Sequence, residues 1–217
     1  MTELLETWSR EASQEDGMTS EHAWIWAEMI RAAPVPPQAS VLDIGCNQGG
    51  FLRVLYDDVG FEGAVGIDLA QIAVARANAS KGQRPIKYIA SPDLSDAGTD
   101  FDIAYSHEVI YLIDDLGDHA RRVMEALKPG GSYFAVTCCH SDNPLWPVWR
   151  EKIGKFSRIP VPNHSVGDIV AAFRENGFTT SVSRFLADSF IPMDPPTEFL
   201  PTDLDRIDIY ARWKIMV

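Results

Sequence analysis

One stretch of eleven residues, 41–51, constrains the fold of this chain more than any other. Its first four residues are apolar apart from Asp43, as expected of a buried strand. Gly45 and Gly49 then permit a turn that side chains would obstruct, and apolar residues return at helical spacing from Phe51. The stretch therefore predicts a strand, a tight loop and the start of a helix.

A loop of this kind first suggests a dinucleotide site, but the glycine pattern does not fit. The dinucleotide fingerprint needs glycine at the first, third and sixth positions, and the middle one lets the backbone approach a pyrophosphate. These positions hold Gly45, Asn47 and Gly50, so the middle requirement fails. The carboxylate of Asp43 would also lie close to a pyrophosphate, whereas it suits a cation. A nicotinamide-dependent oxidoreductase is therefore disfavoured.

A second apolar strand, residues 64–67, also ends in an acid, Asp68. The strand-end acid of a nucleotide-binding βαβ unit commonly accepts hydrogen bonds from ribose hydroxyls. A ligand with an ammonium at one end and a ribose at the other would satisfy both Asp43 and Asp68. S-adenosylmethionine fits that description.

The motif Asp43-x-Gly45, followed by Asp68 at the end of the next strand, resembles the class I S-adenosylmethionine-dependent methyltransferases. Asn47 is a departure, because the family usually has glycine there. The resemblance implies that the cofactor is S-adenosylmethionine, which becomes S-adenosylhomocysteine when the methyl group leaves.

Two further segments carry the resemblance. Residues 101–109 look like the family's fourth strand and the loop after it, and residues 127–134 look like its turn into strand five. The likeness covers residues 38–140 well and the rest only by topology. It implies an α/β fold, a three-layer α/β/α sandwich whose seven-stranded sheet is mostly parallel with an antiparallel last strand.

The hydrophobic pattern agrees, because strands and helices alternate from Ser40 onward, as in a parallel sheet covered by helices on both faces. We expect strands at 41–44, 64–67, 86–90, 101–105 and 132–138, and helices at about 49–58, 70–80 and 114–127. After Cys139 an aromatic and proline-rich insertion, residues 140–149, interrupts the pattern and is expected to shape specificity.

The C-terminal part is expected to complete the sheet. The pattern predicts a helix capped by Ser165 and stopped by Gly177, then a strand at 178–185. A loop at 187–202 leads to a final antiparallel strand within residues 205–217.

Two helices are expected before the sheet. The first covers residues 3–14, and the second begins at the N-cap Ser20 after a turn at residues 16–17. The resemblance implies that residues 1–37 form an N-terminal helical lid over the cofactor-binding domain, residues 38–217, in one compact domain. The tryptophans of these helices, Trp8, Trp24 and Trp26, are either core anchors or ligand neighbours.

The resemblance assigns cofactor contacts to residues that follow the first four strands. They are Asp43 for the ammonium, Gly45, Cys46, Asn47 and Gly49 of the loop, Asp68 for the ribose, Leu69 on the adenine face, Asp93 and Leu94 near the adenine amino group, and Ser106 and His107 at the methionine half. Asp93 is either such a contact or a surface acid.

His107 is the first candidate for a general base, since histidine titrates near neutrality and can take a proton from a hydroxyl or amine. Tyr111 and His140 are further candidates, and Glu108 either borders the site or caps the next helix. Methyl transfer is an in-line displacement, for which alignment alone can lower the barrier by about 7–11 kcal/mol. A dedicated base is therefore optional for nitrogen or thiol acceptors and needed for an unactivated hydroxyl.

Cys138 and Cys139 lie next to His140 and superficially resemble a metal cluster. The spacing is wrong for a tetrahedral zinc site, which needs separated ligand pairs, so we expect no metal and burial of both cysteines as small apolar side chains. The chain has 3 cysteines, which cannot all pair with one another. Reduced thiols and a cytoplasmic location are the simplest interpretation.

The net charge of −12, without a basic run, argues against a nucleic-acid or anionic-membrane partner. No apolar run is long enough to cross a bilayer. The acidity and the aromatic residues at 144–149 favour a small-molecule acceptor, methylated at oxygen or nitrogen by a monomer or homodimer. Two alternatives stay open: a protein side chain as acceptor, or a catalytically silent protein that keeps the fold and binds the cofactor or a partner.

Overall fold

The structure, a computed structural model, describes residues 13–185 and 214–217, and describes side chains from residue 22 onward. A seven-stranded sheet has the order β3-β2-β1-β4-β5-β7-β6. Its strands are β1 (Ser40–Ile44), β2 (Gly63–Asp68), β3 (Ile86–Ala90), β4 (Phe101–His107), β5 (Leu127–Thr137), β6 (Ser183–Arg184) and β7 (Ile215–Met216). Only β7 among them runs antiparallel to its neighbours. The predicted sheet, with its antiparallel last strand, is confirmed.

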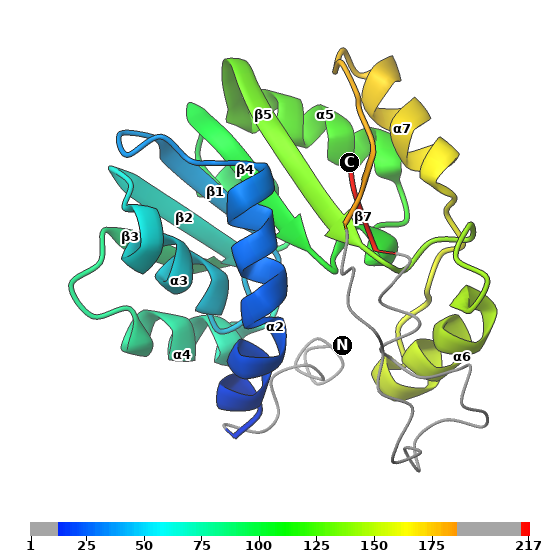
Figure 1. Cartoon of the computed structure of the whole chain (residues 1–217), viewed down its shortest axis with the longest axis horizontal. Coiled ribbons are helices and arrows are strands. Elements are labelled where there is room, and N and C mark those ends of the chain that lie inside the picture. The colour runs from blue at the N-terminus through cyan, green and yellow to red at the C-terminus, as the bar shows by residue number, and fades with distance from the viewer. Residues whose placement is uncertain (1–12, 186–213) are drawn as a thin grey trace.

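Helices cover both faces of this sheet (Figure 1). They are α2 (Ser13–Ala32), α3 (Gly50–Val59), α4 (Gln71–Ser80), α5 (Leu116–Ala126), α6 (Trp146–Ser157) and α7 (Val166–Glu175), with short 3-10 turns η2 (Leu94–Ala97) and η3 (Ile110–Leu112). One core layer joins α2, α3 and α4 to the sheet, and a second joins α5 and α7 to its other face. The three-layer sandwich is thus as predicted. None of the described helices is both long and apolar enough to cross a membrane.

Successive residues of β1 point to opposite faces of the sheet, and helices cover both faces. The strand must therefore be apolar at successive positions, without alternation. Val41 packs in the first core layer and Leu42 in the second. β1 pairs with β2 on one side and with β4 on the other, so the chain changes direction across the sheet between β1 and β4. Ligands of open α/β sheets bind beyond the carboxyl ends of the strands at this point.

The predicted turn at residues 16–17 and the N-cap at Ser20 are wrong, because α2 runs without a break through both positions. A glycine inside a helix costs only about 1 kcal/mol. The apolar face of α2 buries Trp26, Met29 and Ile30 against α3 and the sheet, which outweighs that cost. Most of the helix predicted at 3–14 lies outside the described residues.

The C-terminal half departs from the expectations in two places. The last residues of the insertion at 140–149 already belong to a helix, α6, with Pro147 in its first turn, where proline has no amide bond to lose. The strand predicted at 178–185 is reduced to β6, and the described part of the final strand is β7. The loop at 187–202 lies outside the described residues. By contrast, α7 begins at the predicted cap, because the side chain of Ser165 accepts from the amide of Asp168.

Candidate active site

The loop between β1 and α3 is held in an unusual backbone conformation. Gly45, Asn47 and Gly49 all have positive φ angles, of 77°, 46° and 78°. A Cβ atom on Gly45 would lie 2.3 Å from a methyl carbon of Val109, so this position accepts only glycine. Asparagine tolerates the left-handed region better than most residues, and Asn47 therefore supports the turn where the family usually has glycine.

Asp43 is the last residue but one of β1 and lies close to the start of this loop. Its side chain is only 4% exposed, and no hydrogen bond or ion pair from the part of the chain that the structure describes reaches its carboxylate. Burial, together with the nearby charge of Asp68, raises the pKa of Asp43 to about 8. An acid held in this way binds a cation readily, because a cation would offset both unfavourable effects.

Asp68 ends β2 and ties the two strand ends together. One carboxylate oxygen accepts from the amide of Asn47 at 2.8 Å, and the other accepts from the amide of Ala70 at 2.9 Å. The pattern of strand ends in the sequence predicts Asp43 and Asp68 at one edge of the sheet, and the structure brings both to the same cleft.

The residues expected near an adenine separate into two groups. Leu69, which is 47% exposed, lines the cleft together with Leu94. Asp93 is described but is not part of the lining, since its carboxylate accepts from the amide of Ser95 and pairs with Arg122 at 2.7 Å. The hydrogen bond from the amide of Ser95 is the larger cause, and Arg122 the smaller, that holds the pKa of Asp93 below its usual range. Asp93 therefore caps η2 in this structure.

Ser106 and His107 end β4 and point in different directions. The hydroxyl of Ser106 is buried against the phenol of Tyr133 at 2.6 Å. The ring of His107 lines the cleft, where its Nδ1 accepts from the indole of Trp26 at 3.3 Å. Burial is the main cause that lowers the pKa of His107 well below its ordinary value, and the charge of Lys214 adds to it. His107 is therefore neutral at physiological pH and able to accept a hydrogen bond.

Glu108 follows in the left-handed region, with a φ angle of 54°, which costs a non-glycine residue about 1–2 kcal/mol. Its carboxylate accepts from the hydroxyl of Thr137 at 2.7 Å and from the amide of Cys138 at 3.2 Å, and it pairs with the ammonium of Lys214. Burial alone would raise the pKa of Glu108, but Lys214 and His107 bring it below its usual range. The side chain thus anchors the loop after β4 to β5 and does not cap the next helix.

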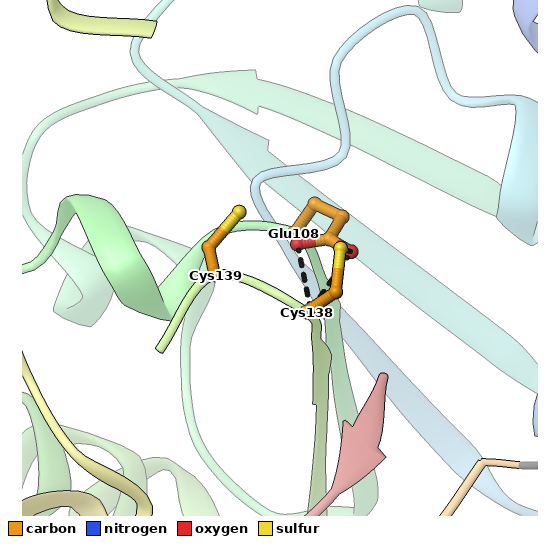
Figure 2. Close-up of side chains that lie close together, drawn as sticks. All are labelled: Glu108, Cys138 and Cys139. Carbon is orange, nitrogen blue, oxygen red and sulfur yellow. Dashed lines mark hydrogen bonds between the residues drawn. The ribbon is translucent and has the colours of Figure 1, made fainter. Parts of the chain in front are cut away.

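Figure 2 shows Glu108 and Cys138 joined by hydrogen bonds, with Cys139 beside them. The ligand atoms of these residues lie within 4.8 Å of one another, close enough to hold a metal ion. The ammonium of Lys214 already contacts the Glu108 carboxylate, however. A metal ion would have to displace it, so the cation of this cluster is Lys214.

The cleft has a volume of about 1640 Å³ and extends from the strand ends to α6. Figure 1 shows α6 beyond the carboxyl ends of β4 and β5. The half that adjoins α6, the apolar half, has walls formed by Tyr111, Cys139, Trp149, Ile153, Phe156 and Ile159, beside Lys152 and Lys155. The polar half holds Asp43 and Asp68, and Glu108, Asp114, Asp115 and Asp118 also line the cleft.

The three candidates for acid–base chemistry do not all reach this cleft. His107 and Tyr111 line it, and burial raises the pKa of the Tyr111 hydroxyl well above its ordinary value. His140, only 2% exposed, is described but is not among the lining residues. Its amide donates to the carbonyl of Cys138 at 3.2 Å, in the turn between β5 and α6.

Two residues of the cleft were not predicted from the sequence. Gln48 is buried, and its Nε2 has no hydrogen-bond partner among the described residues. A polar side chain inside the glycine loop was the available signal. Lys214 was missed because it lies in an alternating pattern of apolar and polar residues, in which a lysine is typical of the side of a strand that faces solvent.

Comparison with known proteins identifies the family. Residues 21–181, most of the 217-residue chain, match a family model described as "Methyltransferase domain". The chain belongs to this family. The predicted membership of the class I S-adenosylmethionine-dependent methyltransferases is confirmed.

Curated relatives of this methyltransferase match parts of it. A ubiquinone biosynthesis O-methyltransferase of Methylobacterium nodulans is 34% identical over 111 residues, which cover 48% of this chain and 43% of the relative. A 2-methyl-6-phytyl-1,4-hydroquinone methyltransferase of Synechocystis is 30% identical over 152 residues, 65% of this chain and 46% of the relative. The chain spans less than half the length of these relatives.

Solved structures share the methyltransferase fold. One is a Haloferax volcanii methyltransferase in complex with the activator Trm112, with a TM-score of 0.79 and 24% identity over 94% of this chain and 92% of that chain. Another is an S-adenosylmethionine-dependent methyltransferase from Mesorhizobium loti, with a TM-score of 0.60 and 24% identity over 72% and 82%. At this identity the likeness supports the fold.

Proposed function

We propose that this methyltransferase transfers the methyl group of S-adenosylmethionine to an oxygen of a small-molecule acceptor. The observation that carries the proposal is the buried carboxylate of Asp43, which no group of the described residues pairs with and which suits the ammonium of the cofactor. Asp68, on the neighbouring strand end, would accept from the ribose hydroxyls. The names of the relatives, which act in quinone and hydroquinone methylation, support an oxygen or ring acceptor of small size.

The remaining cofactor contacts are proposed from their place in the cleft. Gly45, Cys46 and Asn47 line it beside Asp43, and Gly49 shapes the loop. Leu69 and Leu94 would lie against the adenine. Asp93 and Ser106 would act indirectly, since Asp93 caps η2 and the hydroxyl of Ser106 binds Tyr133.

The apolar half of the cleft is the proposed acceptor site. Its aromatic and aliphatic walls favour an acceptor with a flat apolar body, whose hydroxyl would approach His107 at the boundary of the two halves. His107 lines the cleft and is the first candidate for a base, although the donors at its two ring nitrogens oppose its protonation, and Tyr111 is the next candidate. His140 would act only by supporting the turn after β5.

Cofactor binding at pH 7 is expected to release close to one proton. Asp43 has a pKa of about 8 in the free protein and is mostly protonated at pH 7, whereas the ammonium of the bound cofactor would keep it ionised. Calorimetric titration in two buffers of different protonation enthalpy measures this release, with NAD as a control ligand. Asp43→Asn should bind more weakly and release none.

The same raised pKa predicts how stability depends on pH. The contribution of Asp43 to the stability of the free protein is fully present below the ordinary pKa of 3.8 and is lost as pH rises through about 8.

Two outcomes of the calorimetric titration would contradict these assignments. Binding of S-adenosylmethionine to the folded wild type without proton release would show that Asp43 does not hold the ammonium of the cofactor. Absence of any binding would refute the proposed function.

The acceptor class is tested with cofactor that carries a labelled methyl group. Methyl label that has been transferred to members of a panel of hydroxylated aromatic molecules should be extractable into organic solvent. Label that remains on added protein would support the side-chain alternative, and turnover of none of the acceptors, with tight cofactor binding, would support the catalytically silent one.

We also propose that the N-terminal segment, residues 1–37, covers the bound cofactor. His22, Trp24 and Ile25 of α2 line the cleft, and Trp26 binds His107. S-adenosylmethionine should therefore slow amide hydrogen exchange in the second half of α2, measured by mass spectrometry, because closure suppresses local opening. Exchange in α7, none of whose described residues line the cleft, should not change. Equal exchange in α2 with and without cofactor would contradict the lid.

A further inference from the structure

Lys214, which precedes β7, lines the cleft and has no part in the cofactor and acceptor contacts proposed above. Lysine is seldom buried without a partner, yet this side chain is only 2% exposed. Its backbone is fixed, because the amide of Phe185 donates to its carbonyl at 3.0 Å. Its ammonium reaches the loop after β4, 106 residues earlier in the chain.

We propose that Lys214 is a positioning residue of the methyl-transfer site, whose ammonium joins the carboxylate of Glu108 to the ring of His107 and fixes both at the boundary of the cleft halves. The proposal rests on the proposed function of this cleft. It concerns the arrangement of the site and assigns no proton transfer to Lys214.

The first support is the anchoring of Glu108. A left-handed non-glycine residue persists only where its surroundings hold it. Glu108 is held by its own amide, which donates to Val136 at 2.8 Å, and by a carboxylate that binds Thr137, Cys138 and Lys214. Lys214 is the cationic member of this set and the one that connects the loop to the last strand.

The second support is the hydrogen bonding of His107. Nδ1 faces the indole N–H of Trp26 at 3.3 Å, and Nε2 faces the ammonium of Lys214 at 3.4 Å. Indole and ammonium groups can only donate, and an imidazolium carries an N–H at both nitrogens. A protonated ring would therefore meet a donor at both nitrogens, whereas a neutral ring meets one only at the nitrogen that carries its single N–H. The two neighbours keep His107 neutral for as long as both are in place.

The charges around His107 act in the same direction, with one exception. Lys214 from the last strand and His22 from α2 oppose protonation of the ring, as does burial, whereas Glu108 favours it. Lys214 is thus the charged group whose removal should release the ring. Because the Lys214 ammonium lies 3.4 Å from the ring, its removal should raise the pKa of His107. The kcat of a variant without the pair then tells a positioning role from a contribution to stability alone.

The test is the titration of His107, followed by NMR through its ring Cε1–H resonance, which is assigned with a His107→Gln variant. In wild type the ring should titrate below the ordinary histidine range. In Lys214→Met, where Glu108 remains, its pKa should rise by about 1 unit or more. Lys214→Arg, which keeps the charge, should titrate close to wild type. An unchanged pKa in folded Lys214→Met would overturn the proposal.

Lys214→Met leaves the Glu108 carboxylate buried without its cation, and this variant can fail to fold. The double variant Glu108→Gln/Lys214→Met removes both charges and keeps an amide oxygen for Thr137 and Cys138. It should bind S-adenosylmethionine as wild type does, with kcat lower by about tenfold or more. Unchanged kcat in the double variant would overturn the proposal. Cofactor titration of wild type tests the proposed function separately, since the His107 titration needs neither cofactor nor acceptor.

Discussion

Replacement of Asp68 by alanine is expected to weaken S-adenosylmethionine binding about 100-fold or more. Asp68 would accept from the ribose, and it also holds the amides of Asn47 and Ala70 at 2.8 and 2.9 Å. A hydrogen bond to a charged group contributes about 1.5–3 kcal/mol, so the loss of the ribose bonds and of the loop support together reaches this size. Calorimetric titration of the variant against wild type measures the effect.

Two companion variants separate charge from shape. Asp68→Asn keeps the size and one acceptor oxygen, and should lose less affinity than Asp68→Ala. Asp58→Ala removes an exposed acid on α3 and should bind as wild type does. If folded Asp68→Ala retained full affinity, the ribose assignment would be wrong.

Replacement of Gly49 by alanine is expected to lower the free energy of unfolding by about 3 kcal/mol. The φ angle of 78° would cost an L-residue about 1–2 kcal/mol. The new Cβ would lie 2.4 Å from the ring of Tyr88, whose hydroxyl donates to the Gly49 carbonyl at 2.9 Å, and such overpacking adds about 1–3 kcal/mol. Urea denaturation followed by circular dichroism measures the loss.

Gly130→Ala is the control for that experiment. Gly130 has a similar φ angle, 83°, but among the described residues no heavy atom lies within 4 Å of the position that a Cβ atom would take. Only the backbone cost of about 1–2 kcal/mol therefore applies. A loss at Gly49 no larger than the loss at Gly130 would show that Tyr88 moves aside and that the loop is not tightly packed.

The sheet could be predicted because its strands leave strong local signals. Val41 and Leu42 face opposite core layers, so β1 had to be apolar on both sides, and the acid that interrupts it had to lie at its end. The same reasoning placed Asp43 and Asp68 at one edge. These features depend on residues close in the sequence, where period and turn chemistry are informative.

The parts that could not be predicted depend on contacts between distant residues. The pattern around Gly17 indicates a break, and only the burial of Met29 and its neighbours shows why α2 continues. Lys214 has the sequence pattern of a surface residue, and its ion pair with Glu108 becomes visible only when the last strand lies beside β5. His140 was grouped with His107 by residue type, and the fold directs the two rings to different surroundings.

The distance along the chain between Glu108 and Lys214 also bears on the order of folding. Contacts of long sequence separation form late, because a large loop must close before they contribute. In addition, the described part of the last strand meets β5 through a short ladder, the pairs Val136–Met216 and Thr137–Ile215 and the backbone hydrogen bonds between Ala135 and Val217. The central strands can therefore be complete while the cleft still lacks its cation, and catalytic competence would be the last property the chain acquires and the first it loses on partial unfolding.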